Sequence, residues 1–304
     1  MTNKIQASNI QVCMLRRLFI AFVACFLAFG GQNKSYAESS LLKNGLYKSL
    51  GIGTGYYYYG EIDMQGKPVM NLDFGLFNVY GNIGYVASGG FKIDFLLDAN
   101  IALGQYTGGV LDTSDESKDG KRLVSFMTNS FYHGEFKIGY NFLKPFLVER
   151  ASLYLQGGLG YYFNRTDLLS MDRLQGYLYV PIQLEGEAEL SQKWALNYMG
   201  GLNAFILGNH LSTSTKWHYS KNLDVLQSEG FGAKAFIGAT YKTRDDKINS
   251  FRLVYEYWSV EGSPAVAMSD YTGNPLTTKD GKLSGLYEPK NSSHILTLQY
   301  IWNF

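Results

Sequence analysis

His218 and Ser220 are the residues of this 304-residue sequence whose types and spacing best fit nucleophilic chemistry. A histidine can act as a general base and a serine as a nucleophile when their side chains reach each other. Residues two apart share one face of a β-strand, so a strand would bring both side chains to the same side. The triplet His218-Tyr219-Ser220 lies in a Ser/Thr-rich stretch. The alternative to a catalytic pair is therefore a solvated loop beside lipid headgroups.

The triplet resembles the His-x-Ser element of outer-membrane lipid A deacylases and phospholipase A. Those families continue with Asn, or Asn-Gly, directly after the serine, whereas this sequence continues with Lys221 and Asn222. The resemblance covers three residues and implies a Ser/His lipid hydrolase. We keep that enzyme class as an alternative and expect a protein without catalytic residues.

Glu185, Glu187 and Glu189 form the densest acidic group, because alternate residues of a strand lie about 7 Å apart on one face. Unpaired carboxylates in a narrow interior are costly, which favours an ion-pair network. The alternative is a cation-attracting lining of a water-filled path. The expected basic partners are Lys137, Lys193, Lys234 and Arg252. The predicted inward polar side chains also include Lys92, Asp94, Asp98, His133, Glu135 and Glu256.

The composition argues against several other functions. Metal-binding, nucleotide-binding and redox motifs are absent from the sequence, so we expect no cofactor and no metal. Both cysteines, Cys13 and Cys25, lie near the N-terminus. Residues 38–304 contain 23 basic and 26 acidic residues, a net charge of −3, which gives no sign of a nucleic-acid partner.

The inward charges belong to segments in which polar and apolar residues alternate, as in strands between two environments. The segment 91–103 is the clearest, with Phe91, Ile93 and Phe95 against Lys92 and Asp94. About 9–11 tilted residues are enough to cross a membrane as a strand. We expect ten such strands, near 46–59, 74–87, 91–103, 132–142, 153–163, 174–190, 194–206, 233–241, 251–257 and 296–304.

The second of these segments breaks the alternation. Leu72, Phe74 and Leu76 have the phase opposite to that of Phe77 and Val79. If the interior is polar, this change of phase predicts a bulge or a shorter strand.

The connections between the segments alternate in length. The links 88–90, 143–150, 191–193 and 242–250 are short, whereas 60–71, 104–129, 164–173, 208–230 and 262–291 are longer and polar. Short periplasmic turns and long outer loops are typical of transmembrane barrels. The sequence therefore predicts an all-β fold, a monomeric antiparallel transmembrane β-barrel of about ten strands with both termini in the periplasm. A turn at Asp280-Gly281, within 271–286, could add a hairpin and make twelve.

The last strand ends on an aromatic residue. Its outward side chains are Leu296, Leu298, Tyr300, Trp302 and Phe304. This pattern resembles the C-terminal recognition strand of bacterial outer-membrane β-barrels. The resemblance implies insertion by the barrel-assembly machinery with periplasmic chaperones, and contact with outer-membrane lipids and lipopolysaccharide.

The N-terminus has the layout of a secretory signal peptide over residues 1–37. Arg16 and Arg17 precede the apolar run 18–29, and Ser35-Tyr36-Ala37 provides an A-x-A-like cleavage site. A lipoprotein acylated at Cys25 is the alternative. We expect the mature chain, residues 38–304, to be a single barrel domain in the cell outer membrane.

These observations favour a porin-like or surface-exposed barrel without catalysis. The alternatives are the lipid hydrolase and an adhesin or receptor that acts through its loops. The strand count is also similar to that of the omptin surface proteases, which need paired acids opposite an Asp-x-His pair. None of the four histidines, His133, His210, His218 and His294, has an aspartate two residues before it.

Overall fold

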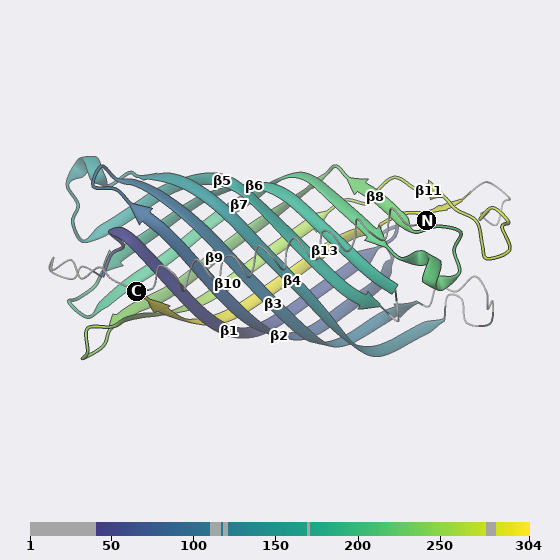
Figure 1. Cartoon of the computed structure of the whole chain (residues 1–304), viewed down its shortest axis with the longest axis horizontal. Coiled ribbons are helices and arrows are strands. Elements are labelled where there is room, and N and C mark those ends of the chain that lie inside the picture. The colour runs from purple at the N-terminus through teal and green to yellow at the C-terminus, as the bar shows by residue number, and fades with distance from the viewer. Residues whose placement is uncertain (1–40, 110–116, 118–120, 169–170, 278–283) are drawn as a thin grey trace. The chain divides into compact units, whose positions relative to one another are not determined.

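Ten long antiparallel strands form a closed barrel (Figure 1). The computed structural model describes residues 41–109, 117, 121–168, 171–277 and 284–304, and the predicted signal peptide lies outside these residues. The barrel strands are β1 (Gly45–Ile62), β2 (Pro68–Val86), β3 (Phe91–Gly109), β4 (Arg122–Asn141), β5 (Ala151–Leu168), β6 (Met171–Glu189), β7 (Trp194–Ser212), β9 (Gly230–Lys242), β10 (Ile248–Val260) and β13 (Lys290–Asn303).

Each barrel strand pairs with its neighbours in the sequence of strands, and β1 closes the wall by pairing with β13. In the described part of the chain, three short strands lie outside this wall. The strand β8 (Leu223–Gln227) pairs with the end of β7, while β11 (Val266–Ala267) and β12 (Gly285–Leu286) form a separate two-stranded sheet. The prediction of an antiparallel ten-stranded barrel is therefore confirmed. Among the described residues no helix is long and apolar enough to cross a membrane.

The two ends of the barrel differ. We call the end with the links 87–90, 142–150 and 190–193 the turn end; it also carries the link 243–247 and the C-terminus (Figure 1). The opposite, loop end carries the 3-10 helix η2 (Ser214–Trp217), β8 and the β11–β12 sheet. Two of the five predicted long loops are short, because β1 and β2 continue to a turn at 63–67 and β5 and β6 continue to residues 168 and 171.

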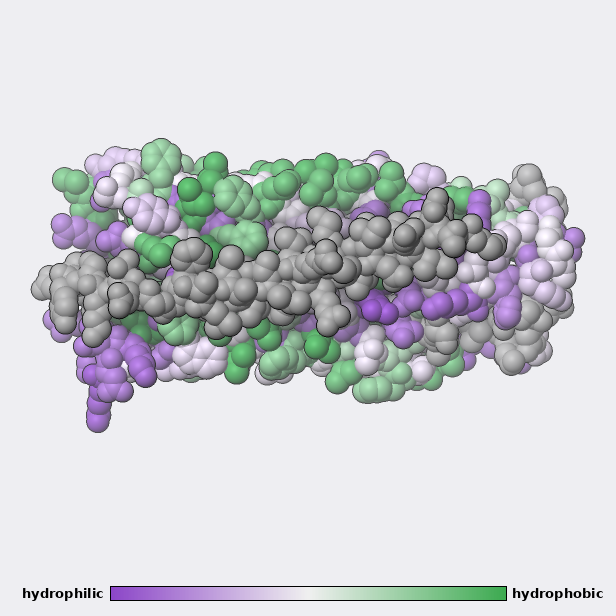
Figure 2. Space-filling view, viewed as in Figure 1, coloured by the Kyte–Doolittle hydropathy of each residue, from purple (hydrophilic) through white to green (hydrophobic). Residues whose placement is uncertain are grey.

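The outer surface of the wall is apolar, as expected for contact with lipid. Alternate residues such as Ile52, Phe77, Ile138 and Leu253 are exposed, whereas their chain neighbours point inward. Figure 2 shows hydrophobic residues along the side of the barrel and hydrophilic ones gathered toward its ends. Alternation between lipid and lumen explains why no long apolar run is needed.

The predicted bulge or early end in the second strand is wrong. β2 pairs in continuous register with β3 from Met70 to Val86, and Leu72, Phe74 and Leu76 are buried inside the barrel. The reason is that the lumen is not polar throughout. Near the loop end its filling is apolar and aromatic, so an inward leucine or phenylalanine keeps the phase of the strand.

A bulge occurs instead between β6 and β7. Leu178 pairs with Leu207 and Tyr179 with Phe205, so Ile206 is the extra residue. Ile206 and Leu207 are both exposed, at 47% and 39%, and the inward phase of β7 therefore changes at this point. Beyond the bulge, Gly208, His210 and Ser212 point into the barrel.

The closing strand lies between β1 and β10. Leu296, Leu298 and Phe304 are exposed on the outer face, whereas Tyr300 and Trp302 are half-buried against each other. Ile301 and Ile295 are the apolar residues of the inward face among the described residues, and both are buried in the lumen. Phe304 still belongs to the wall, because its backbone N–H donates to the carbonyl of Lys48 at 2.8 Å.

Candidate functional site

The lumen near the turn end contains a cluster of buried ion pairs. The Nζ atom of Lys92 lies 2.7 Å from Glu185 Oε2 and 3.1 Å from Asp94 Oδ2. Lys43 approaches the same glutamate, with 2.8 Å between Nζ and Oε1, and lies 3.5 Å from Glu187 Oε1. The Lys43 pKa is raised, because the two glutamates outweigh the effect of burial, which alone would lower it.

The predicted basic partners of the three glutamates are wrong. In the described part of the chain the ion pairs of these glutamates go to Lys43, Lys92 and Arg150. Lys193 is exposed in the turn before β7 and does not reach the lumen. Lys43 lies before the first strand, so strand alternation gave no signal for it.

The segment before β1 lies along the inner face of β6. The backbone N–H of Leu41 donates to Glu189 Oε1 at 2.9 Å, and that of Lys43 donates to Glu187 Oε2 at 3.0 Å. With the Lys43 side chain on Glu185, the three glutamates form consecutive attachment points for residues 41–43. We call residues 41–43 the N-terminal arm; its attachment covers part of the lumen at the turn end.

A second charged cluster lies further into the lumen. His133 Nε2 is 2.8 Å from Glu256 Oε1, and His133 Nδ1 is 3.8 Å from Asp98 Oδ1. Lys137 lies 3.4 Å from Glu135, and Lys234 lies 3.4 Å from Glu256 and 3.9 Å from Glu135. These residues come from β3, β4, β9 and β10, so the cluster ties opposite parts of the wall together.

Arg252 is also in the lumen but makes neutral contacts. Its Nε donates to Asn197 Oδ1 at 2.9 Å, and its Nη1 lies 3.5 Å from Tyr80 Oη. Its Cζ lies 4.3 Å from the ring centre of Phe236 and 5.9 Å from that of Tyr80, distances typical of cation–π contacts.

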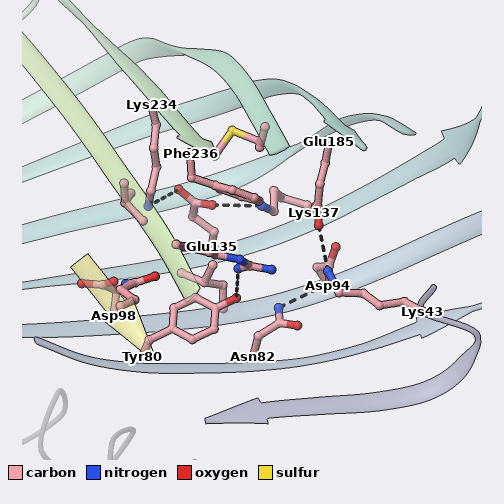
Figure 3. Close-up of a pocket in the computed structure, with 15 residues that line it drawn as sticks. Lys43, Tyr80, Asn82, Asp94, Asp98, Glu135, Lys137, Glu185, Lys234 and Phe236 are labelled. Carbon is pink, nitrogen blue, oxygen red and sulfur yellow. Dashed lines mark hydrogen bonds and ion pairs between the residues drawn. The ribbon is translucent and has the colours of Figure 1, made fainter. Parts of the chain in front are cut away.

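A chamber lies between the two charged clusters (Figure 3). Tyr80, Asp94, Glu135, Lys137 and Lys234 are among its lining side chains. It offers about 40 Å³ for the centres of water molecules. One water needs about 10–15 Å³ by this measure, so the chamber holds a few waters and is too small to be a wide channel.

Aromatic side chains fill the lumen toward the loop end. Tyr162 packs on Tyr177 with ring centres 5.2 Å apart, on Trp258 at 5.9 Å and on Phe131 at 6.1 Å. Tyr179 packs edge-on against Trp258 at 5.0 Å. These five residues, which we call the aromatic layer, are all at most 2% exposed and leave little space between them.

A third charged cluster lies beyond the aromatic layer, and the sequence analysis did not identify it. Arg173 bonds Glu288 at 2.8 Å and also contacts Glu61. His210 Nε2 lies 3.0 Å from Glu288 Oε2 and 2.6 Å from Ser212 Oγ. Burial alone would raise the Glu288 pKa, but Arg173 and His210 hold it at about 2.

His210 and Ser212 form a second His-x-Ser triplet, and with Glu288 they have the residue types of a catalytic triad. Catalysis of that kind needs the acid on one ring nitrogen of the histidine and the nucleophile on the other. Here both contacts are made by Nε2, while Nδ1 is buried without a hydrogen-bond partner among the described residues. All three side chains are at most 5% exposed, and their contacts do not have the geometry of a catalytic triad.

The predicted pair His218 and Ser220 lies in a loop, as the solvated-loop alternative required. His218 follows η2 with a left-handed backbone (φ 66°), so the two side chains do not share a strand face. Ser220 Oγ accepts a hydrogen bond from the backbone N–H of Ser269 at 3.0 Å, which joins two loops. Within the described residues, no three His, Cys, Asp or Glu side chains are arranged to hold a metal ion.

Comparison with solved structures identifies the class of fold. The chain is similar to the outer membrane protease OmpT from Escherichia coli, with a TM-score of 0.56 and 11% identity over 88% of this chain and 100% of that chain. It also matches the toluene transporters TbuX from Ralstonia pickettii (TM-score 0.35, 8% identity, 87% and 90% covered) and TodX from Pseudomonas putida (0.32, 7%, 89% and 95%).

The chain therefore has the fold of bacterial outer-membrane β-barrels. At these identities the likeness extends to the fold alone. No protein-family model and no curated protein sequence matches the chain.

Proposed function

We propose that this protein is a surface-exposed outer-membrane barrel that acts through its loop end and performs neither open-pore transport nor catalysis. The observation that carries this proposal is the filling of the lumen. Two charged clusters, the aromatic layer and a third charged cluster follow one another along the barrel, and the N-terminal arm lies at the turn end. A wide aqueous path would need several of these contacts to break.

The loops at the loop end are packed and joined by hydrogen bonds, as a preformed binding surface requires. Trp217, Tyr219 and Met268 are buried although they lie outside the barrel strands. The loop after β7 and the loop after β10 are joined by Ser220 and Ser269, whose backbone N–H groups are both donors in that contact. Loops that are ordered before binding lose less conformational entropy when a partner docks, which favours the adhesin or receptor class over a flexible cover.

Planar-bilayer recording tests the closed lumen. Purified mature protein should insert without conductance steps across a range of voltages, with a general porin as the positive control for the recording. Regular steps from a protein whose folding is verified by heat-modifiable gel migration would contradict the proposal.

Cysteine labelling tests the orientation. Single cysteines at Lys121 and Lys221, both exposed near the loop end, should react with an impermeant thiol reagent on whole cells. Cysteines at Ser191 and Asp245, both exposed at the turn end, should react only after the outer membrane is permeabilised. The reverse pattern would put the loop end in the periplasm and remove the surface role.

The lipid hydrolase is a second candidate, favoured by the meeting of His210, Ser212 and Glu288 in space. Purified protein in mixed micelles should release no acyl chains from lipid A or phospholipid. If release occurs, its loss in Ser212→Ala with retention in Ser220→Ala would assign it to the buried triplet, and the converse would assign it to the loop pair.

A further inference from the structure

Arg252 is a buried cation without an acidic partner. Its side chain belongs to a residue that is 6% exposed, yet it takes part in none of the ion pairs of the described residues. Its polar contacts, Asn197 and Tyr80, engage Nε and Nη1. In the described part of the chain no hydrogen bond engages Nη2, and this atom is not among the fully shielded atoms that lack a partner, so it is open to the space of the chamber. A cation in a buried residue without an acidic partner carries a large energetic cost.

The acids that share the chamber with Arg252 are engaged elsewhere. Asp94 accepts from Gln156 at 2.7 Å and pairs with Lys92, and Asp98 accepts from Asn78 at 2.9 Å. Glu135 accepts from the hydroxyl of Tyr179 at 2.9 Å and pairs with two lysines. Glu185 is held between two further lysines, as described above. The Arg252 guanidinium therefore lines this chamber without an acidic partner among the described residues.

The wall is shaped to hold the guanidinium in this position. Arg252 lies beside Gly238 of β9. A Cβ atom at Gly238 would come within 2.8 Å of both Arg252 Cγ and Asn197 Oδ1. Glycine therefore allows the arginine stem to cross β9, and the two aromatic rings fix the plane of its head.

We infer that the chamber binds a small monovalent anion, of the size of chloride or formate, at the Nη2 edge of the Arg252 guanidinium. The planar fork of N–H donors suits a carboxylate or a halide, and charge-assisted hydrogen bonds of this type are strong. The space of about 40 Å³ for water centres limits the ligand to a few heavy atoms. The four carboxylates around the chamber disfavour a dianion such as sulfate.

Bromide provides a direct probe. Crystals of the mature protein in detergent, grown in sodium bromide, should give an anomalous peak within hydrogen-bonding distance of the Arg252 guanidinium. A chamber without bromide at a concentration of about 1 M would overturn the inference.

Thermal unfolding in detergent provides the solution test. Sodium bromide is compared with sodium gluconate at equal ionic strength, because both screen charges equally whereas gluconate is too large for the chamber. Bromide should raise the unfolding temperature of the wild type relative to gluconate. In Arg252→Met, the apparent bromide affinity should fall by about tenfold or more, as expected for loss of charge-assisted hydrogen bonds.

Two further variants keep the solution test decisive. Arg150→Met removes an arginine whose side chain is 68% exposed at the turn end, and it should retain the wild-type bromide response. Tyr80→Phe keeps the ring and removes the hydroxyl that accepts from Nη1, so it frees a further donor and should retain or strengthen the bromide response even if Arg252→Met fails to fold; a lost response in this variant would count against the site. A wild type that responds equally to both anions, or an unchanged response in Arg252→Met, would overturn the site.

Discussion

Lys43 and Glu185 are joined across the lumen, with 2.8 Å between Nζ and Oε1, although 142 residues separate them in the sequence. The contact connects the N-terminal arm to β6, which lies across the barrel from β1 in the order of the strands. It makes a residue outside the barrel strands part of the charge balance of the lumen.

Replacing Lys43 with Met should therefore lower the thermal stability of the barrel. Glu185 and Glu187 would lose a buried partner, and breaking such a pair costs about 3 kcal/mol. The measurement is the temperature at which the purified protein loses its folded gel migration. Lys67→Met, at an exposed turn position, is the matched control and should melt like the wild type.

Changing Glu185, Glu187 and Glu189 together to Gln should also destabilise the protein, because Lys43 would lose both its acidic partners and Lys92 would keep Asp94 alone. Combining Glu185→Gln with Lys43→Met should cost less than the sum of the two single changes. A triple mutant that melts like the wild type and conducts cations would favour the alternative of a cation-attracting lining.

Truncation of the aromatic layer should have a larger effect than truncation of an exposed ring. Tyr162→Ala removes a fully buried ring that contacts Phe131, Tyr177 and Trp258, and should cost about 3–5 kcal/mol. Tyr271→Ala, at a loop residue that is 59% exposed, is the control. Similar denaturant midpoints for the two variants would show that the layer contributes little to stability.

The loop-end cluster should make stability depend on acid pH. The Glu288 pKa of about 2 lies below its ordinary value of 4.5, so its stabilising contribution is complete above about pH 4.5 and is lost as the pH falls toward 2. Denaturant midpoints measured from pH 2 to 6 should fall on acidification. Glu288→Gln should flatten this slope, whereas Glu229→Gln, at an exposed position, should leave it unchanged.

The last strand should be needed for assembly. Tyr300, Trp302 and Phe304 changed together to Ser should leave the protein unfolded, since Tyr300 packs on Phe251 and Trp302 and all three lie on the outer face. The control is a triple change to Ser at the exposed link residues Phe146, Leu147 and Val148. Normal heat-modifiable migration of the β13 variant would refute an assembly role for these aromatics.

The sequence was sufficient to predict the wall of the barrel, because each strand lies between lipid and lumen over most of its length. The segment that begins at Phe91 is a strand with the predicted facing of its residues. The composition of the lumen was harder to predict. Leu72, Phe74 and Leu76 break the alternation of the second strand only if the whole interior is assumed to be polar.

The contacts inside the lumen could not be predicted from alternation alone. A strand pattern says which side chains point inward, but not which of them meet across the barrel. Lys43 lies before the first predicted strand, and His210 lies in the predicted link 208–230, so neither was given an inward face; the structure extends β7 to Ser212, and the extra residue at Ile206 turns His210 into the barrel. Both omissions therefore have a geometric cause.

The bulge at Ile206 also has a consequence for sequence comparison. A gap-free alignment with a barrel that has a regular seventh strand would pair His210 and Ser212 with lipid-facing positions of that protein. The alignment positions of His210 and Ser212 would then combine lipid-facing residues, which are apolar, with lumen-facing residues, which are charged or hydrogen-bonded. A barrel with a regular seventh strand is best aligned to this chain with a one-residue gap at Ile206, which restores the equivalence of inward positions on both sides of it.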